Sequence, residues 1–557
     1  MKKIIFSLLA LLWAFGAFSQ APTFTANTFN PPDTAHFCYG INSGYLSKYW
    51  PDTASSHLQR ILGAHSTRTF NFAYAEVPLG KRWAKPTYDF NANQNHFYNN
   101  TICLNGVYGP DADNTVYTIP TRTSSGANLP SQMFAGIYNP IWNSDGTPDT
   151  ANNTFAKYVW DIVSGYGSTF HYYEIWNEPD ISSGNGVNIA SGQPGSWWQN
   201  MPPPQDIYNL RCPITHYIRC LRIAYEIIHK YNPGAKVVTG GIGFPVFLDQ
   251  LCRYTDNPGS AGDGDVLKGA GSVTPAYPIT GGGYIDMLSF HNYPFYSLSV
   301  YNNTTSRHDY RRNSDTAIAI LKQFFQGFQT VLANRGYGTT YPAKQFMLTE
   351  TDGGHASVWN NPNLYGAGDV QRNFTMKVLA VLQQLGVVQA YDYQIADEVP
   401  LPDNSNDPDP IASVMGKFYF VDSIKNTNYS ACKLAPAGIG RITQSGLLFG
   451  YYYDSVKTKA INLNTNISVG LAFTKPALGS TPAQTRYMLW TYQHRDKVEY
   501  DTSVITFPTG VTVSKVWNWD ACLNRATGQP YPYPSQYISS NFTGNTIKVS
   551  GTPVIVQ

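Results

Sequence analysis

Two glutamates stand out in this chain of 557 residues because each follows directly on an apolar run with the length of a β-strand. Glu178 follows residues 172–176 and precedes a proline, which cannot continue the hydrogen-bonded ladder of a strand. Glu350 follows residues 346–349 in the same way. Cleavage of a glycosidic bond requires a pair of carboxyl groups, one that donates a proton and one that attacks carbon. This chemistry is open to the chain only if both strands end at the same place.

A fold that brings strand ends together is predicted by the alternation of short apolar runs with amphipathic helical patterns over residues 36–400. The predicted strands comprise residues 37–42, 66–71, 132–137, 172–176, 236–240, 286–290, 346–349 and 387–391. The clearest helical patterns comprise residues 154–164, 217–231, 314–334 and 370–385. Eight parallel strands close a (β/α)8, or TIM, barrel, an α/β fold whose catalytic groups lie at the carboxyl ends of the strands. Glu178 and Glu350 then belong to the fourth and seventh strands.

The first glutamate belongs to the sequence Glu-Ile-Trp-Asn-Glu-Pro at residues 174–179. This motif on a fourth strand, together with an apolar seventh strand that ends in glutamate, resembles clan A of the glycoside hydrolases. The motif looks especially like that of family 39, which holds β-xylosidases and α-L-iduronidases, and the resemblance covers residues 36–445. It implies that Glu178 is the acid/base, that Glu350 is the nucleophile and that anomeric configuration is retained. It also implies that Asn177 hydrogen-bonds the sugar 2-hydroxyl.

Further positions match the pattern of the clan. The sequence Ser-Phe-His-Asn-Tyr-Pro ends the sixth strand, and the resemblance implies that His291 lines the sugar subsite while Tyr293 donates to Glu350 and keeps it ionised. Arg68, on the second strand, matches an arginine that orients the nucleophile, and Trp176 is a further expected contact to the substrate. The structural alternatives are aromatic residues packed at a strand end and, for Arg68, an ion pair.

The match to the clan fails on the eighth strand, where many members carry a tryptophan as a floor for the sugar ring. The present chain reads Tyr-Asp-Tyr there, so Tyr391 is the expected sugar contact, with Tyr393 or Trp359 as alternatives. Trp197 and Trp198, in the loop after the fourth strand, could form a platform for a sugar or pack within their loop. The identity of the sugar therefore stays open.

Composition excludes several other classes of function. Charged residues make up 13% of the chain and the net charge is +2, which does not favour a nucleic-acid partner. Aromatic residues make up 14%, which suits a neutral, ring-shaped ligand or a large core. No histidines at ligand spacing, glycine-rich phosphate loop or Gly-x-Ser-x-Gly elbow is present, so no metal and no cofactor is expected. The aromatic-rich segment 73–130 is expected to be a long loop on the catalytic face.

The two ends of the chain differ from the barrel. Residues 1–19 have the basic start, apolar stretch and small-residue cleavage site of a signal peptide, which predicts a secreted protein without a membrane anchor. Residues 20–35 are expected to form an extension that pairs with the C-terminal domain. Residues 446–557 are predicted to be an antiparallel β-sandwich, with strands at 460–463, 468–473, 486–492, 503–507, 512–517 and 546–549. The seven cysteines are an odd number, so at least one remains unpaired within the chain.

The sequence therefore predicts a secreted retaining glycoside hydrolase that acts on a polysaccharide or oligosaccharide. Two alternatives remain open: a carbohydrate-binding protein on the same barrel, and a transglycosylase that uses the same two glutamates. Xylosides, other neutral β-glycans and galactans are all candidate substrates. Endo or exo action and the oligomeric state also stay open.

Overall fold

The computed structural model describes residues 37–43, 58–69, 100–107, 109–121, 124–167, 170–180, 210–258, 274–310, 313–356, 366–397, 414–419, 433–463, 467–492, 499, 501–523, 542–543 and 545–557. The predicted signal peptide and N-terminal extension, Trp197, Trp198 and Trp359 lie outside these residues, as do residues 73–99 of the predicted loop 73–130. The described part of that segment contains a barrel strand at residues 100–104 and a two-stranded sheet at residues 116–130, so it is not one long loop. Among the described helices, none has both the length and the apolar character needed to cross a membrane.

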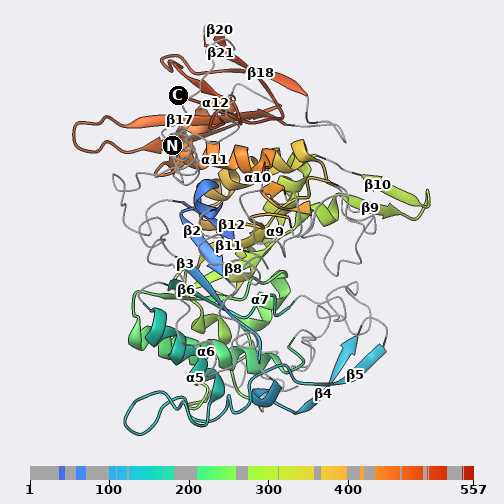
Figure 1. Ribbon diagram of the computed structural model, residues 1–557, viewed down its shortest axis with the longest axis vertical. Helices are drawn as coiled ribbons and strands as arrows, with labels where there is room; N and C mark the ends of the chain where they lie inside the picture. Colours follow the sequence, from blue (N-terminus) through green and yellow to red (C-terminus); the bar gives the residue numbers. More distant parts are fainter. Residues whose placement is uncertain are drawn as a thin grey trace, which may run out of the picture.

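Eight parallel strands close on themselves into a barrel, which confirms the predicted α/β barrel class (Figure 1). The order around the barrel is β1-β12-β11-β8-β7-β6-β3-β2, and every neighbouring pair is parallel. The strands are β1 (Cys38–Asn42), β2 (Ser66–Thr69), β3 (Asn100–Leu104), β6 (Phe170–Ile175), β7 (Lys236–Thr239), β8 (Met287–His291), β11 (Gln345–Thr351) and β12 (Val387–Asp392).

The predicted third strand at residues 132–137 is wrong, because β3 takes that place in the barrel. The segment instead forms a turn in which Gly136 has a φ of 68°, a left-handed conformation that interrupts an extended chain. Met133 and Phe134 are fully buried there, so their apolar character serves the packing of a loop. Strand β3 was missed because it begins with two polar residues, while residues 132–137 form the more apolar run.

Helices cover the outside of the barrel: α5 (Thr154–Tyr166), α6 (Ile214–Tyr231), α7 (Pro245–Leu251), α9 (Ser314–Asn334), α10 (Gly368–Gln384) and α11 (Pro436–Leu448). The side chains of Asn153 and Asn313 cap α5 and α9 by accepting hydrogen bonds from backbone N–H groups of the first turn. Short 3-10 helices comprise η3 (Gly109–Asp111), η5 (Gly281–Tyr284) and η6 (Pro294–Ser297). Helices α10 and α11 lie between the barrel and the C-terminal sheets (Figure 1).

Among the described residues, three two-stranded antiparallel sheets lie outside the barrel. They pair β4 (Val116–Thr121) with β5 (Ser124–Pro130), β9 (Ser299–Asn302) with β10 (Arg307–Tyr310), and β13 (Phe418–Tyr419) with β14 (Lys433–Leu434). Within the barrel, a cluster of inward-facing residues comprises Tyr172, Val238, Met287, Met347 and Tyr391. This apolar layer separates the lower interior from the polar residues nearer the carboxyl ends of the strands.

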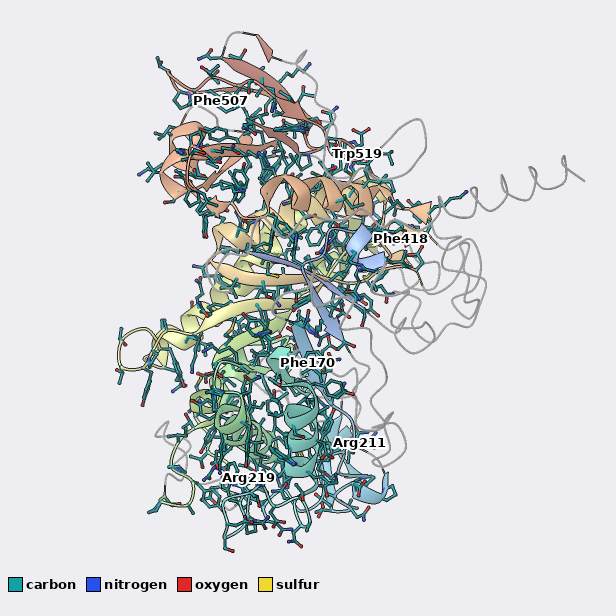
Figure 2. The ribbon with its side chains drawn as sticks, turned by 60° about the vertical axis from the view of Figure 1, so that its left-hand side comes forward. Phe170, Arg211, Arg219, Phe418, Phe507 and Trp519 are labelled. Atoms are coloured by element: carbon teal, nitrogen blue, oxygen red, sulfur yellow. The ribbon has the colours of Figure 1, made fainter. Side chains whose placement is uncertain are left out.

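The C-terminal part consists of antiparallel sheets, as predicted. The five-stranded sheet has the order β15-β16-β17-β22-β19 and the three-stranded sheet has the order β18-β21-β20. The elements are β15 (Tyr452–Tyr453), α12 (Ser455–Asn462), β16 (Ser468–Lys475), β17 (Gln484–Thr491), β18 (Thr502–Thr506), β19 (Val516–Trp517), β20 (Phe542–Thr543), β21 (Thr546–Ser550) and β22 (Val554–Val556). In Figure 2, Phe507 lies among these sheets, at the opposite end of the molecule from Arg219 on α6.

Two details of this part differ from expectation. The predicted strand at residues 460–463 is wrong, because residues 455–462 form α12, whose first turn is capped by the side chain of Asp454 through the N–H of Lys457. Helix α11 contains residue 445, the predicted domain boundary, and it continues to Leu448.

A buried polar network joins the C-terminal part to the barrel. The carboxylate of Glu499 accepts hydrogen bonds from the N–H of Ser314 at 2.7 Å and from the amide of Asn373 at 2.8 Å. The ammonium group of Lys377 lies 2.8 Å from the Asp315 carboxylate and 3.8 Å from that of Glu499. Because each buried charge has an opposite charge beside it, separating the two parts would leave these charges uncompensated.

A chain cut after Leu448 is therefore expected to be insoluble or strongly destabilised, because the cut exposes the faces of α10 and α11 and removes Glu499. The measurement is the soluble yield and the thermal unfolding temperature, compared with the full chain. The variant Glu499→Gln is the milder probe, since it keeps the domain and removes only one charge, and it should destabilise by roughly 1–3 kcal/mol. A soluble and fully active truncated barrel would refute this expectation.

Candidate active site

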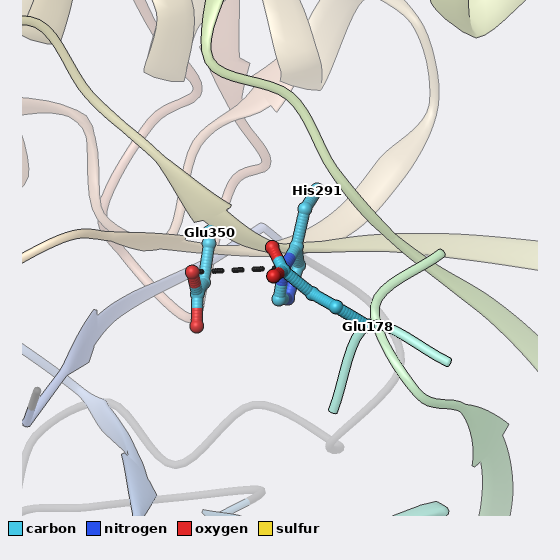
Figure 3. Close-up of side chains that lie close together, drawn as sticks. All are labelled: Glu178, His291 and Glu350. Carbon is cyan, nitrogen blue, oxygen red and sulfur yellow. Dashed lines mark hydrogen bonds and ion pairs between the residues drawn. The ribbon is translucent and has the colours of Figure 1, made fainter. Parts of the chain in front are cut away.

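Polar side chains from five strands of the barrel converge at its carboxyl end. Figure 3 shows Glu178, His291 and Glu350 meeting at one point, from the turn after β6, the end of β8 and the end of β11. Arg68 of β2 and Asn42 of β1 reach the same place. The fold thus brings together the two glutamates that the sequence singled out.

The two carboxylates lie close to each other. Nδ1 of His291 lies 2.7 Å from Oε1 of Glu178 and 3.6 Å from Oε2 of Glu350. One oxygen of each carboxylate and one nitrogen of the imidazole all lie within 4.8 Å of one another. Carboxyl groups about 5–5.5 Å apart suit direct attack on the sugar, whereas about 6.5–9.5 Å is needed to fit an attacking water. The approach of one oxygen of each carboxyl group to within 4.8 Å is consistent with the shorter of these two separations.

Glu350 is held as a carboxylate by three donors. Oε1 accepts hydrogen bonds from Arg68 at 2.6 Å and from the amide of Asn42 at 3.2 Å, and Oε2 accepts one from the hydroxyl of Tyr293 at 2.6 Å. Burial alone would raise the pKa of Glu350, but the positive charges of His291 and Arg68 and these hydrogen bonds hold that pKa below its ordinary value. Glu350 is therefore ionised over the neutral range and available as a nucleophile.

Arg68 connects this carboxylate to a second one that the sequence analysis did not single out. Its Nε lies 2.5 Å from Oε2 of Glu174, and its Nη2 donates to the side-chain oxygen of Asn177 at 2.8 Å. Arg68 and Glu174 are fully buried. Burial would lower the pKa of Arg68, but Glu174 and Glu350 together raise it, so Arg68 stays charged. The guanidinium is thus fixed in place between two carboxylates.

Glu174 is anchored from its other side as well. Its Oε1 accepts hydrogen bonds from the hydroxyls of Ser289 at 2.7 Å and Thr349 at 2.8 Å. These hydroxyls come from β8 and β11, so Glu174 links three strands within the barrel. The sequence feature that could have identified Glu174 is its position as the one carboxylate in this mostly aromatic strand, two positions before Trp176.

Replacing Arg68 with methionine removes a positive charge beside Glu350, so the pKa of Glu350 is expected to rise. A nucleophile with a higher pKa becomes protonated at a higher pH, so the acidic limb of the kcat/KM profile should move to higher pH. The maximum of kcat/KM should fall by roughly 10²-fold, because the carboxylate also loses its orientation. The variant Arg68→Lys keeps the charge and should show the smaller shift. An unmoved acidic limb in folded Arg68→Met would contradict this reading.

Glu178 sits on a strained turn. Trp176 has a φ of 73° and Glu178 a φ of 48°, both in the left-handed region that non-glycine residues rarely adopt. Backbone hydrogen bonds hold the turn: the N–H of Trp176 donates to the carbonyl of Leu104 at 2.8 Å, and that of Glu178 donates to the carbonyl of Gly240 at 2.6 Å. The side chain of Glu178 is 26% exposed and that of Glu350 is 9% exposed, so the two carboxyl groups have different environments.

His291 lies between the two carboxyl groups and is almost completely buried. Burial lowers the pKa of His291, but the charges of Glu350 and Glu178 outweigh this effect and leave that pKa above its ordinary value. For Tyr293, burial and the charge of Glu350 both raise the pKa, which lies well above its ordinary value. The hydroxyl therefore remains a neutral donor. Both residues thus supply protons to hydrogen bonds with the carboxylates.

The aromatic residues predicted to contact a sugar have different positions in the structure. Tyr391 does not reach the barrel mouth: it is fully buried in the apolar layer, where its hydroxyl bonds to Ser66 at 2.6 Å and Thr101 at 2.7 Å, so its predicted contact with a sugar is wrong. Tyr393, two positions on, packs edge-on against Tyr293 with ring centroids 6.2 Å apart. Trp176 is 6% exposed and packs against core residues, which limits any surface it offers to a substrate.

Glu178, His291 and Glu350 also have the atom types and the spacing that could hold a metal ion. Both oxygens of Glu350 already accept hydrogen bonds, and one of these comes from the positive charge of Arg68. A cation at this point would face that charge at short range. The arrangement therefore favours proton transfer and nucleophilic attack over metal binding.

Comparison with protein-family models and with curated proteins gives no match. Among solved structures, a monomeric β-xylosidase from Caulobacter crescentus CB15 is similar at 12% identity over 95% of this chain and 97% of the other, with a TM-score of 0.47. A GH39 enzyme from Xanthomonas axonopodis pv. citri (12% identity, 95% of each chain, TM-score 0.44) and a GH30 endoxylanase from Clostridium papyrosolvens C71 (10%, 94% and 97%, 0.44) are also similar.

These structures are glycoside hydrolases of clan A, the clan that the two motifs resemble. The identities are near 10% and the TM-scores lie below 0.5. Likenesses at this level leave the fold to be assigned from the strand order of the barrel, and the chemistry from the residues at its mouth.

Proposed function

We propose that this protein is a retaining O-glycosyl hydrolase that cleaves a polysaccharide or oligosaccharide by double displacement. The observation that carries the proposal is the pair of carboxylates at the barrel mouth, with atoms within 4.8 Å, of which Glu350 is held ionised while Glu178 is more exposed. Two carboxyl groups with different environments are what the two roles in this reaction require.

In the first step, an oxygen of Glu350 attacks the anomeric carbon while the bond from that carbon to the leaving oxygen breaks. Glu178, in its acid form, transfers its proton to the leaving oxygen. The product is a glycosyl ester on Glu350. Arg68, Asn42 and Tyr293 support this step, because they hold Glu350 in one orientation and as a carboxylate before the attack.

In the second step, the Glu178 carboxylate removes a proton from water as the water oxygen attacks the anomeric carbon. The ester bond breaks and Glu350 returns as a carboxylate, so configuration is retained after two inversions. Asn177 supports the reaction from the side: its oxygen is held by Arg68, which directs the NH2 end of its amide as the donor for a sugar hydroxyl. Nδ1 of His291, 2.7 Å from Oε1 of Glu178, orients the carboxyl group of Glu178, which is protonated before the first step and ionised before the second.

The proposal includes export through the N-terminal signal peptide and a β-sandwich for the C-terminal domain. The sandwich is supported by a hydrophobic cluster that draws on both sheets, with Ala472 and Leu489 from one and Ile505 and Ile547 from the other. Two sheets that share one apolar layer bury it from water, which gives the C-terminal domain a structural role.

The test of the proposed function is the configuration of the first product. The protein is screened on purified polysaccharides and aryl glycosides, and the best substrate is followed by proton NMR. A β-glycoside should give the β-anomer first, before mutarotation. The α-anomer as first product would show inversion and overturn the double-displacement mechanism. Products longer than the substrate, in excess acceptor, would identify a transglycosylase instead, and binding without cleavage would identify a carbohydrate-binding protein.

A further inference from the structure

Asp180 is a buried carboxylate two residues beyond Glu178, and the reaction proposed above does not use it. Its side chain is fully buried. The N–H of Gly243 donates to both of its oxygens, at 3.1 and 3.0 Å, and the N–H of Phe244 donates to Oδ2 at 2.9 Å. A buried carboxylate is costly unless donors compensate it, so this one is held in place by the segment that follows β7.

That segment, residues 240–244, is the β7 exit loop, and it touches the site at two further points. The carbonyl of Gly240 accepts the N–H of Glu178 at 2.6 Å, and the carbonyl of Ile242 accepts the N–H of His291 at 3.1 Å. Gly241 has a φ of 63°, and a Cβ there would lie 2.0 Å from Nε2 of His291. The β7 exit loop is therefore in contact with both the residue that carries the proton and the imidazole that holds it.

The turn that carries Glu178 needs such support. A non-glycine residue in the left-handed region is strained, and the turn contains two of them, Trp176 and Glu178. Such a conformation persists only where neighbouring contacts fix it. Leu104 holds the turn before Glu178, and Gly240 holds Glu178 itself. Asp180 provides the contact on the far side, because it is the next anchored residue along the chain.

We propose that Asp180 is a positioning residue for Glu178: by binding the backbone of Gly243 and Phe244, it fixes the turn against the β7 exit loop and keeps the Glu178 carboxyl group beside His291. This inference rests on the proposed function, in which Glu178 is the acid/base. Loss of Asp180 then impairs proton donation to the leaving group more than it impairs attack by Glu350, whose partners are Arg68 on β2 and Tyr293 just before η6.

The test compares substrates that need acid catalysis to different extents. Among β-xylosides, β-glucosides and β-galactosides, the sugar that the wild-type protein hydrolyses fastest is used as its phenyl and 2,4-dinitrophenyl glycosides. Dinitrophenolate leaves without a proton, whereas phenolate needs one. For Asp180→Ala, kcat/KM should fall by roughly 10²-fold on the phenyl glycoside and by less than about tenfold on the dinitrophenyl glycoside.

Two other variants make the result decisive. Asp180→Asn keeps the volume and one acceptor oxygen, so it is measured if Asp180→Ala does not fold. It should show the same imbalance, a larger loss of kcat/KM on the phenyl than on the dinitrophenyl glycoside, but to a smaller extent. Asp256→Asn is the matched control: Asp256 is also fully buried, but its partners are Arg219 and Arg222 on α6, away from the turn. Any loss it causes should be equal on the two glycosides.

An equal loss on both glycosides for the two Asp180 variants would overturn the positioning role and leave Asp180 a structural residue. Glu178→Ala is measured in parallel and should show the largest imbalance. If Glu178→Ala shows no imbalance, the fault lies with the proposed function and its assignment of the acid. If Glu178→Ala shows the imbalance and the Asp180 variants do not, only the present inference fails.

Discussion

Glu350→Ala is expected to lose hydrolytic activity on every substrate, by roughly 10⁴-fold or more, whatever the leaving group. The reason is that no other described carboxylate lies where it could attack the same face of the sugar. Glu174 is buried beneath Arg68 and bonded to Ser289 and Thr349. Glu178 lies beside His291 and, in the proposed mechanism, serves the leaving group. The measurement is kcat/KM on phenyl and dinitrophenyl glycosides.

Added azide distinguishes a missing nucleophile from a misfolded protein. In Glu350→Ala, azide can enter the vacated space and attack the anomeric carbon directly, while Glu178 still protonates the leaving oxygen. A β-glycoside should then give the α-glycosyl azide, with inverted configuration, which the anomeric proton coupling identifies. Glu226→Ala is the control, since Glu226 bonds to Trp142 and Arg222 on the outside of the barrel and its loss should leave activity unchanged. Retained hydrolysis in Glu350→Ala would place the nucleophile elsewhere.

The barrel could be predicted because most of its strands are apolar runs that alternate with amphipathic helical patterns, a signal that depends on neighbours in sequence. The failure at the third strand has the same origin. Residues 132–137 are apolar because the loop packs into the core, while β3 begins with Asn100 and Thr101, so hydrophobicity pointed to the loop. Only pairing with β2 and β6, which involves residues far apart in sequence, marks β3 as a strand of the barrel.

In the candidate site, too, residues marked by local sequence could be predicted, and residues that depend on long-range contacts could not. Glu178 and Glu350 were predictable because each ends an apolar strand, and the structure brings them together. Glu174 and Asn42 were missed, because their contacts, Glu174 with Arg68 and Asn42 with Glu350, join residues far apart in the sequence. Tyr391 and Tyr393 are two positions apart, so alternation alone places them on the same side and cannot separate them. The structure shows Tyr391 in the apolar layer within the barrel, whereas Tyr393, beyond the end of β12, lies beside Tyr293. A pattern of residues along one strand cannot show which neighbour faces it.

Glu178→Ala is expected to separate the two steps of the reaction. The first step needs an acid only when the leaving group is poor, so the formation of the glycosyl-enzyme from a dinitrophenyl glycoside should be nearly unimpaired. The second step needs a base to deprotonate water, so it should slow by roughly 10²–10⁴-fold. The glycosyl-enzyme then accumulates, and stopped-flow kinetics should show a burst of dinitrophenolate. A phenyl glycoside should be turned over very slowly, because its leaving group receives no proton.

Azide should restore turnover in Glu178→Ala, because it is an anion that needs no base and can enter the space left by the carboxylate. In the proposed mechanism Glu178 and Glu350 act on opposite faces of the sugar, so azide in the place of Glu178 should attack the glycosyl ester from the face opposite Glu350. A β-glycoside should therefore give the β-glycosyl azide, with configuration retained. The two alanine variants should thus give azide products of opposite anomeric configuration. Instability of the protein could lower the yield of either product but could not change its configuration. If the α-azide came from Glu178→Ala and the β-azide from Glu350→Ala, the roles of the two glutamates would be reversed.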